Sequence, residues 1–279
     1  MSDVLFFAIA LGVSLVVSSM GFARVVWFIS VGYGYSVAAI AVAAAVILRN
    51  GLDPWSALQV ALLLGYGIRL GTYLLVRDRA RGYSRERETL SQRESRVGVG
   101  LRLLIWIGVS VLYAAMTAPA FLPLVDKAAA AGAGAASAVS GGALVATIVG
   151  LAVMALGLGL ETAADLQKSA YKKAHPDRFC DVGVYRVSRC PNYLGEILMW
   201  VGGFIAGSPF LSSWYRIAVS GAGLLVIVLI MLGAAKNLEA KQESRYGSDP
   251  EYRNFASAVP ILFPLIPLRS LKGLKVYLG

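Results

Sequence analysis

A polar segment between two apolar runs carries the residues that could do chemistry. Residues 161–200 read ETAADLQKSAYKKAHPDRFCDVGVYRVSRCPNYLGEILMW, with Glu161 at the end of one apolar run and Glu196 near the start of the next. The stretch between them is basic and rich in groups that bind phosphate. Ionisable groups at membrane depth are costly and are disproportionately functional. We therefore treat this segment as the candidate site.

Glu196 is the first candidate for catalysis. On a helix, Tyr193, Glu196 and Trp200 share one face, at spacings i, i+3 and i+7. A poorly solvated carboxyl group there could stay protonated and donate a hydrogen bond to a substrate oxygen. The alternative is a structural carboxyl group that bonds to neighbouring helices or lies at the water interface. The sequence alone leaves both interpretations open.

The cations of this segment are candidates for phosphate binding. Arginine and lysine suit phosphate, so they could hold the diphosphate of a dinucleotide. The more common role of such cations is positive charge beside the membrane, which attracts anionic lipid. Neither GxGxxG nor a P-loop occurs, so a nucleotide site would be neither Rossmann nor Walker type. The cluster consists of the cations Lys168, Lys172, Arg178, Arg186 and Arg189 together with the acidic residue Asp165.

Tyr66 and Arg69 lie inside another apolar run, LLLGYGIRLGTYLLV. A buried arginine needs a partner, for which Glu161 or Glu196 is the natural candidate. Snorkelling to the interface is the alternative. About 10 Å of helix separates Arg69 from the end of the span near Val76, which favours a paired arginine.

The composition is that of an integral membrane protein. Hydrophobic residues make up 57% of the 279 residues and charged residues 15%, against about 45–50% and about 25% in soluble domains. We expect an all-α polytopic fold, a single membrane domain over 1–279, with a retained first span and the fifth helix continuing to Pro176. The expected spans are about seven, near 3–23, 25–48, 55–76, 102–123, 142–164, 192–210 and 214–235.

The net charge of +10 fits the membrane better than nucleic acid. Basic residues concentrate in 77–102, in 165–190 and in the tail after 235, which is the positive-inside pattern. We therefore expect a bacterial inner-membrane protein with its N-terminus outside and its C-terminus in the cytoplasm. The Ala/Gly/Ser-rich segment 124–141 is expected to be a flexible external connection.

Histidine and cysteine are scarce. His175, Cys180 and Cys190 are the complete set, which is too few for a typical transition-metal centre, so we expect no metal site. The cysteine spacing does not indicate a disulfide framework.

The motifs of the candidate segment resemble a known family. The sequence reads E-x-x-x-D-x-Q-K from Glu161 and G-x-Y-R-x-S-R-x-P-N-Y-x-G-E from Gly183 to Glu196, and the tail adds Arg245-Tyr246-Gly247 and later Val259-Pro260. This pattern resembles the DUF1295 branch of the steroid 5-alpha-reductase superfamily. The similarity is densest over 161–260.

The resemblance implies a membrane reductase with a cytosol-facing cavity for NADPH. Its substrate would be a lipid with a reducible carbon–carbon double bond, such as a 3-oxo-delta-4 steroid or another conjugated enone. Glu196 looks like the substrate-orienting acid and Tyr66 like its tyrosine partner. The residues expected to contact the cofactor are Asp165, Lys168, Lys172, Arg178, Arg186, Arg189, Asn192, Tyr193, Arg245 and Tyr246.

Two departures from the family pattern are visible. The steroid reductases use a glutamine from an early span, but no glutamine precedes Gln59, which is off the expected position. Cys190 stands where this branch usually has a histidine before the proline.

Two other classes remain open. The first is a membrane methyltransferase of the isoprenylcysteine or phospholipid type, which uses S-adenosylmethionine and shares an R-H-P-x-Y-x-G core. Here Cys190 replaces that histidine, and Asn192-Tyr193 with Glu196 favours the reductase. The second is a transporter or scaffold, whose signature would be two matching halves with broken helices. No such repeat is visible.

The charge asymmetry predicts the topology. Reporter fusions after residue 135 and after residue 279 should lie on opposite sides of the membrane, because three spans separate them. Alkaline phosphatase activity should mark the first fusion and green fluorescent protein the second. Signals from the same side would rule out the seven-span arrangement.

Overall fold

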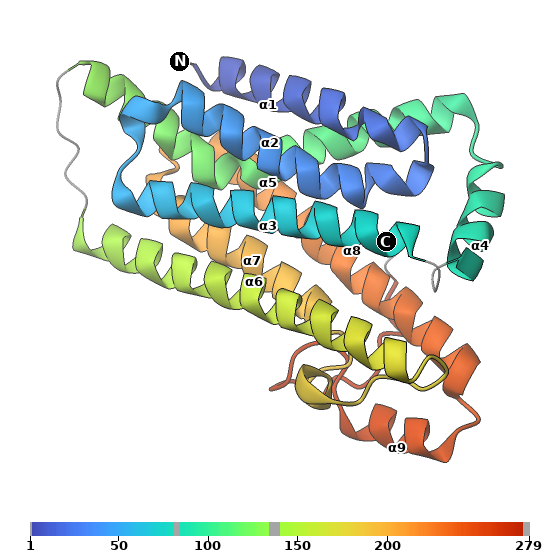
Figure 1. The fold of residues 1–279 in the computed structure, drawn as a ribbon. Helices are drawn as coiled ribbons and strands as arrows, with labels where there is room; N and C mark the ends of the chain where they lie inside the picture. The colour runs from blue at the N-terminus through green and yellow to red at the C-terminus, as the bar shows by residue number, and fades with distance from the viewer. Residues whose placement is uncertain (1, 81–83, 134–139, 276–279) are drawn as a thin grey trace. The chain divides into compact units, whose positions relative to one another are not determined.

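The computed structural model describes residues 2–80, 84–133 and 140–275. Over these residues the chain is all-α, with no strand (Figure 1). The helices are α1 (Asp3–Ser18), α2 (Val31–Ile47), α3 (Pro54–Arg79), α4 (Ser84–Glu94), α5 (Val99–Gly132), α6 (Gly141–Ala174), α7 (Pro191–Gly207), α8 (Trp214–Tyr246) and α9 (Pro250–Ala258). Short 3-10 turns cover 19–22, 25–28, 49–51, 183–186 and 208–210.

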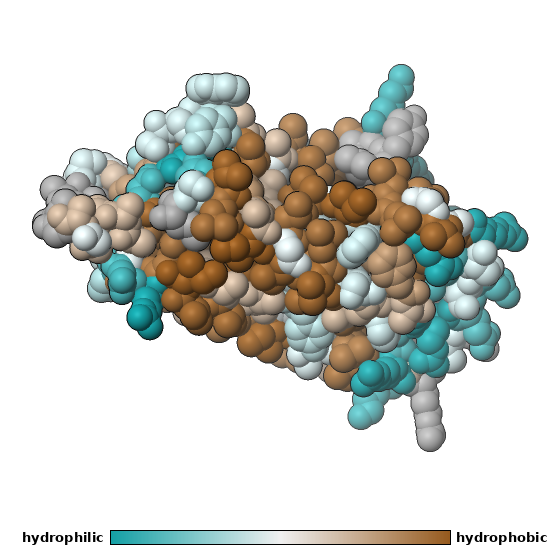
Figure 2. Space-filling model, turned by 90° about the horizontal axis from the view of Figure 1, so that it is seen from above, coloured by the Kyte–Doolittle hydropathy of each residue, from teal (hydrophilic) through white to brown (hydrophobic). Residues whose placement is uncertain are grey.

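The chain is a polytopic membrane protein. Six segments of the described residues are long and apolar enough to cross a membrane: Asp3–Phe22, Val25–Ile47, Pro54–Arg79, Val99–Gly132, Gly141–Ala174 and Trp214–Tyr246. Figure 2 shows many apolar side chains exposed on the face that it draws. Exposed apolar surface is expected where a protein contacts lipid.

The seventh expected span differs from the others. In place of a span over 192–210, α7 has 17 residues and ends at Gly207, where a 3-10 turn begins. Its length of about 25 Å is less than the roughly 30 Å of a bilayer core. The seventh crossing, and the orientation of the termini that depends on it, stay predictions.

Two expected loops are partly helical. The segment 124–141 does not begin as a loop, because α5 continues to Gly132 through an alanine-rich stretch of high helix propensity; residues 134–139 lie outside the described part. The basic segment 77–102 contains α4. The expected continuation of the fifth helix is confirmed, since α6 ends at Ala174.

The chain forms two compact units. Unit 1 consists of residues 1–151 and 204–223, and unit 2 of residues 152–203 and 224–279. Helices α6, α7 and α8 contribute residues to both. The segment of densest similarity to the family, 161–260, falls in unit 2 apart from residues 204–223.

Tight helix packing and a chain of tyrosines build the interior of unit 1. A Cβ atom on Gly34 would lie 2.5 Å from the backbone nitrogen of Gly71, so α2 and α3 touch backbone to backbone. Beside this contact the hydroxyl groups of Tyr33 and Tyr66 are 2.8 Å apart. The Tyr33 ring stacks on Tyr113, whose hydroxyl donates to the Phe28 carbonyl.

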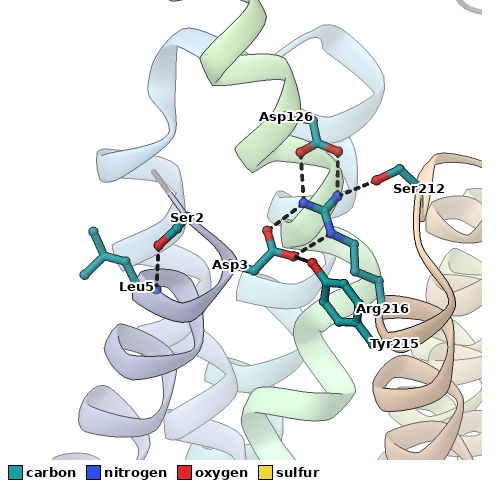
Figure 3. A network of polar contacts seen from close by, with 7 residues as sticks. All are labelled: Ser2, Asp3, Leu5, Asp126, Ser212, Tyr215 and Arg216. Carbon is teal, nitrogen blue, oxygen red and sulfur yellow. Dashed lines mark hydrogen bonds and ion pairs between the residues drawn. The ribbon is translucent and has the colours of Figure 1, made fainter.

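Arg216 ties three helices of unit 1 together. Its guanidinium forms paired hydrogen bonds with Asp3 of α1 and with Asp126 of α5, at 2.5–2.9 Å (Figure 3). Ser212 accepts a further bond from Arg216, and Tyr215 donates its hydroxyl to Asp3. Because two-pronged pairs fix both distance and orientation, this network sets the register of α1, α5 and the start of α8.

Candidate functional site

Two glycines bring α6 and α7 of unit 2 into backbone contact. A Cβ atom on Gly157 would lie 2.5 Å from both the carbonyl oxygen of Gly195 and the nitrogen of Met199. A Cβ atom on Gly195 would lie 2.6 Å from the nitrogen of Glu161. Gly195 therefore allows the short helix α7 to pack closely on α6. The contact brings Glu161 beside the residue that precedes Glu196.

A polar stripe runs along one face of α6. Glu161, Asp165, Lys168 and Lys172 follow one another at spacings of four, three and four residues, which keeps them on one side of the helix. Glu161 and Asp165 are buried, and both lysines are half-buried. Glu196 on α7 is also buried, with 7% of its surface exposed. These three carboxyl groups therefore lie in the interior of unit 2.

The loop after α6 is fixed to that helix by Gln167 and Gly183. The side-chain oxygen of Gln167 accepts a hydrogen bond from the Val184 backbone at 2.9 Å. Gly183 has a φ of 58°, and a Cβ atom there would lie 2.1 Å from the same oxygen. Only glycine suits this position. Tyr185 completes the attachment by donating its hydroxyl to the Ala164 carbonyl.

The C-terminal tail folds back over the start of α7. The backbone nitrogens of Arg189 and Cys190 donate to the carbonyls of Pro260 and Ile261, at 3.0 and 2.9 Å. These two backbone hydrogen bonds join the tail to the residues just before α7. Leu262 and Leu271 bury their side chains in the same cluster as Cys190.

A buried ion pair lies under this tail. The guanidinium of Arg189 is 3.8 Å from the carboxylate of Glu239, and both side chains are at most 4% exposed. Glu239 also accepts a hydrogen bond from the Leu271 backbone, and Arg189 donates to the Arg269 carbonyl. Arg189 thus anchors the tail, a role that the sequence did not indicate.

Lys172 lies at the centre of a second polar group. Its ammonium donates to the Arg178 carbonyl and to the Tyr246 hydroxyl, the latter at 2.8 Å. The Tyr246 ring belongs to an aromatic cluster with Phe179, Tyr252 and Phe255. This cluster joins the loop to the end of α8 and to α9.

The exposed arginines pair with acids at the surface of unit 2. Arg178 lies 3.1 Å from both Asp181 and Glu251, and Arg245 lies 3.0 Å from Asp177. Nearby carboxylates, Asp181 first, raise the pKa of Arg178 above its ordinary value. Exposed pairs of this kind contribute little to stability, so an incoming anion can replace the carboxylates.

The remaining predicted contacts lie at the loop and at the start of α7. Arg186 is exposed on the 3-10 turn 183–186, and Tyr193 is half-buried. Asn192 has a buried side-chain oxygen that accepts no hydrogen bond from the described residues. An unsatisfied buried acceptor costs about 1–3 kcal/mol, so this oxygen is a candidate for bonding to a ligand.

Tyr66 and Arg69 belong to unit 1. Tyr66 is fully buried against Tyr33, a residue whose part in this contact the sequence did not reveal. The predicted partnership of Tyr66 with Glu196, and of Arg69 with either glutamate, joins residues of different units. Both partnerships stay predictions.

Neither cysteine is activated as a nucleophile. Cys180 and Cys190 are buried and free. Complete burial raises the pKa of the Cys190 thiol to about 12, so it is protonated at neutral pH. The family usually has a histidine at this position. In this chain the side chain of Cys190 is an unreactive thiol, and its backbone nitrogen holds the tail.

Two residues of unit 2 escaped the sequence analysis. Glu239 is buried near the end of an apolar run, just as Glu161 is, and this shared pattern is the signal that could have found it. Gly157 was missed because a single glycine inside an apolar helix has no distinctive pattern.

One comparison with known proteins gives a match. A family model described as "Protein of unknown function (DUF1295)" matches residues 16–259, which is most of the chain. No curated protein and no solved structure matches it.

The glycine contact predicts a contrast between two neighbouring substitutions on α6. Gly157→Ala should lower the melting temperature of the purified protein, because its Cβ would meet backbone atoms of α7 and overpacking costs about 1–3 kcal/mol. A Cβ atom on Gly159 would have no atom within 4 Å. Gly159→Ala should therefore leave the melting temperature equal or higher, because alanine favours helices. Equal melting temperatures for the two variants would contradict the backbone contact.

Proposed function

Because the chain belongs to the DUF1295 family, within the steroid 5-alpha-reductase-like superfamily, we propose that it is an NADPH-dependent reductase. Its substrate is a membrane lipid with a carbon–carbon double bond conjugated to a carbonyl group, such as a 3-oxo-delta-4 steroid. Unit 2 holds the cofactor. The observation that carries the proposal is the buried oxygen of Asn192, which lacks a hydrogen-bond donor among the described residues and lies one helical turn before the buried Glu196.

The polar groups of unit 2 fit a nicotinamide dinucleotide. The carboxamide of a nicotinamide carries N–H donors that suit the Asn192 oxygen. Lys172, Arg178 and Arg245 supply cations for a diphosphate, and the surface ion pairs of the two arginines are exposed enough to exchange partners. Arg186 is exposed on the same loop and is available for a further phosphate. With no strand among the described residues, such a site is built from helix ends and loops.

Glu196 would act as a hydrogen-bond donor to the substrate. When bound, NADPH would supply a hydride to the electron-poor end of the double bond. The negative charge that this leaves on the conjugated oxygen would be stabilised by a hydrogen bond from a protonated Glu196, and a proton from solvent would complete the reduction at the adjacent carbon.

Substitution of Lys172 distinguishes a cofactor site from general positive charge beside the membrane. Lys172→Ala should weaken NADPH binding roughly ten- to hundred-fold, since a charged hydrogen bond contributes about 1.5–3 kcal/mol. Lys173→Ala is the matched control, because Lys173 is the exposed neighbour on the same helix. Fluorescence titration of the purified protein measures both. Equal weakening by the two variants would mean that only general charge matters.

Glu196→Gln tests the catalytic assignment. The variant keeps the shape and an N–H donor but loses the acid, so it should bind NADPH normally and turn over about 10²–10³-fold more slowly. NADPH oxidation with an enone lipid found by screening is the measurement. Glu243→Gln, a change to an exposed carboxylate of α8, should keep full activity. A fully active Glu196→Gln enzyme would refute the assigned role.

A further inference from the structure

Unit 1 contains a cavity that the proposed reductase chemistry does not use. Its volume is about 420 Å³, within the range of small-molecule sites. The turn 50–53, the start of α3, the C-terminal half of α5, the start of α6 and residues 206–210 form its wall. All of these residues belong to unit 1, and none of them is a predicted catalytic or cofactor residue.

The wall of the cavity is held rigidly on two sides. A Cβ atom on Gly51 would lie 2.6 Å from the nitrogen of Ala128, so the turn is packed directly on α5. A Cβ atom on Gly207 would meet the Pro119 carbonyl of the same helix. Thr147 hydrogen-bonds across to the Ala206 carbonyl at 3.3 Å. The cavity is therefore a feature of the packing and does not depend on a loose loop.

The charges of the wall cancel one another. The Lys127 ammonium lies 2.5 Å from the Asp53 carboxylate and 5.1 Å from the centre of the Phe210 ring. Burial opposes ionisation of Asp53, but hydrogen bonds from Lys127 and Ser56 outweigh it and hold the pKa of Asp53 below its ordinary value. Because the two charges compensate each other, a charged ligand would gain little net attraction from the wall, so the cavity suits an uncharged molecule.

Buried polar side chains line the wall between its apolar residues: Ser56, Gln59 and Thr147. A glutamine amide has two donor hydrogens and an acceptor oxygen with two lone pairs, so Gln59 can bond to a ligand in addition to the chain. A ligand that fits this wall is mainly apolar and carries one hydroxyl or carbonyl group.

We infer that this cavity binds a compact, uncharged amphiphile. Its volume corresponds to about fourteen water molecules at about 30 Å³ each, which admits a single-chain alcohol. The charged headgroup of a phospholipid would find no uncompensated charge at the Asp53–Lys127 pair. The site is separate from the proposed function and stands whether or not unit 2 binds NADPH.

Photo-crosslinking of the full chain in phospholipid nanodiscs tests the site. The probe is a diazirine derivative of dodecanol, with unlabelled dodecanol, dodecyl phosphate and dodecane as competitors. Mass spectrometry should locate the crosslinks on residues of the cavity wall. Dodecanol should compete at least ten-fold better than dodecyl phosphate.

Two substitutions on the exposed side of α5 give a matched pair. Ala131→Trp places a large side chain in the cavity and should reduce crosslinking at least ten-fold, while Ala129→Trp, exposed but outside the wall, should leave it unchanged. Neither residue is buried, so neither variant threatens the core. Gln59→Leu should weaken competition by dodecanol and spare competition by dodecane.

Three results would overturn the inference. Crosslinks spread evenly over the apolar surface would mean partitioning from the bilayer. Undiminished labelling of Ala131→Trp would place the probe elsewhere. Equal competition by dodecyl phosphate and dodecanol would contradict the selection for uncharged ligands. These three results do not depend on whether unit 2 binds NADPH.

Discussion

The close approach of α6 and α7 at Gly157 and Gly195 is the contact on which unit 2 depends. A methyl group on either residue would collide with backbone, which moves far less easily than a side chain. The contact fixes the position of Glu196 along the axis of α7 relative to the polar stripe of α6. The acids and lysines of that stripe can therefore act together with residues that lie thirty positions further along the chain.

Buried charge imposes the second constraint. A membrane-embedded interior has little water to solvate ions, so each buried group needs a partner from the chain. Unit 2 supplies these partners through its loop and tail: Gln167 holds the turn at Gly183, and Glu239 holds Arg189 and Leu271. The Asn192 oxygen is one of several buried polar atoms among the described residues that depart from this rule. In the proposed function a ligand satisfies it.

Much of the fold could be predicted from the sequence, because apolar runs and basic loops are strong signals. The extension of α6 beyond the apolar run followed from residue type, and the helical part of 124–132 was missed because alanine and glycine were weighed as a flexible linker. For the site, the burial of Glu196 and Asp165 could be predicted from the motif. The tail anchor at Arg189 was not, since it depends on Glu239 and Leu271, which lie about fifty and eighty residues away.

The central claim is that this chain binds a reduced nicotinamide dinucleotide, and calorimetric titration of the purified protein tests it most directly. NADPH should bind with a stoichiometry of one, and its affinity should fall as salt is raised, because salt screens contacts between phosphates and exposed cations. S-adenosylmethionine should give no heat of binding under the same conditions. Saturable binding of S-adenosylmethionine without binding of NADPH would contradict the account and favour a methyltransferase.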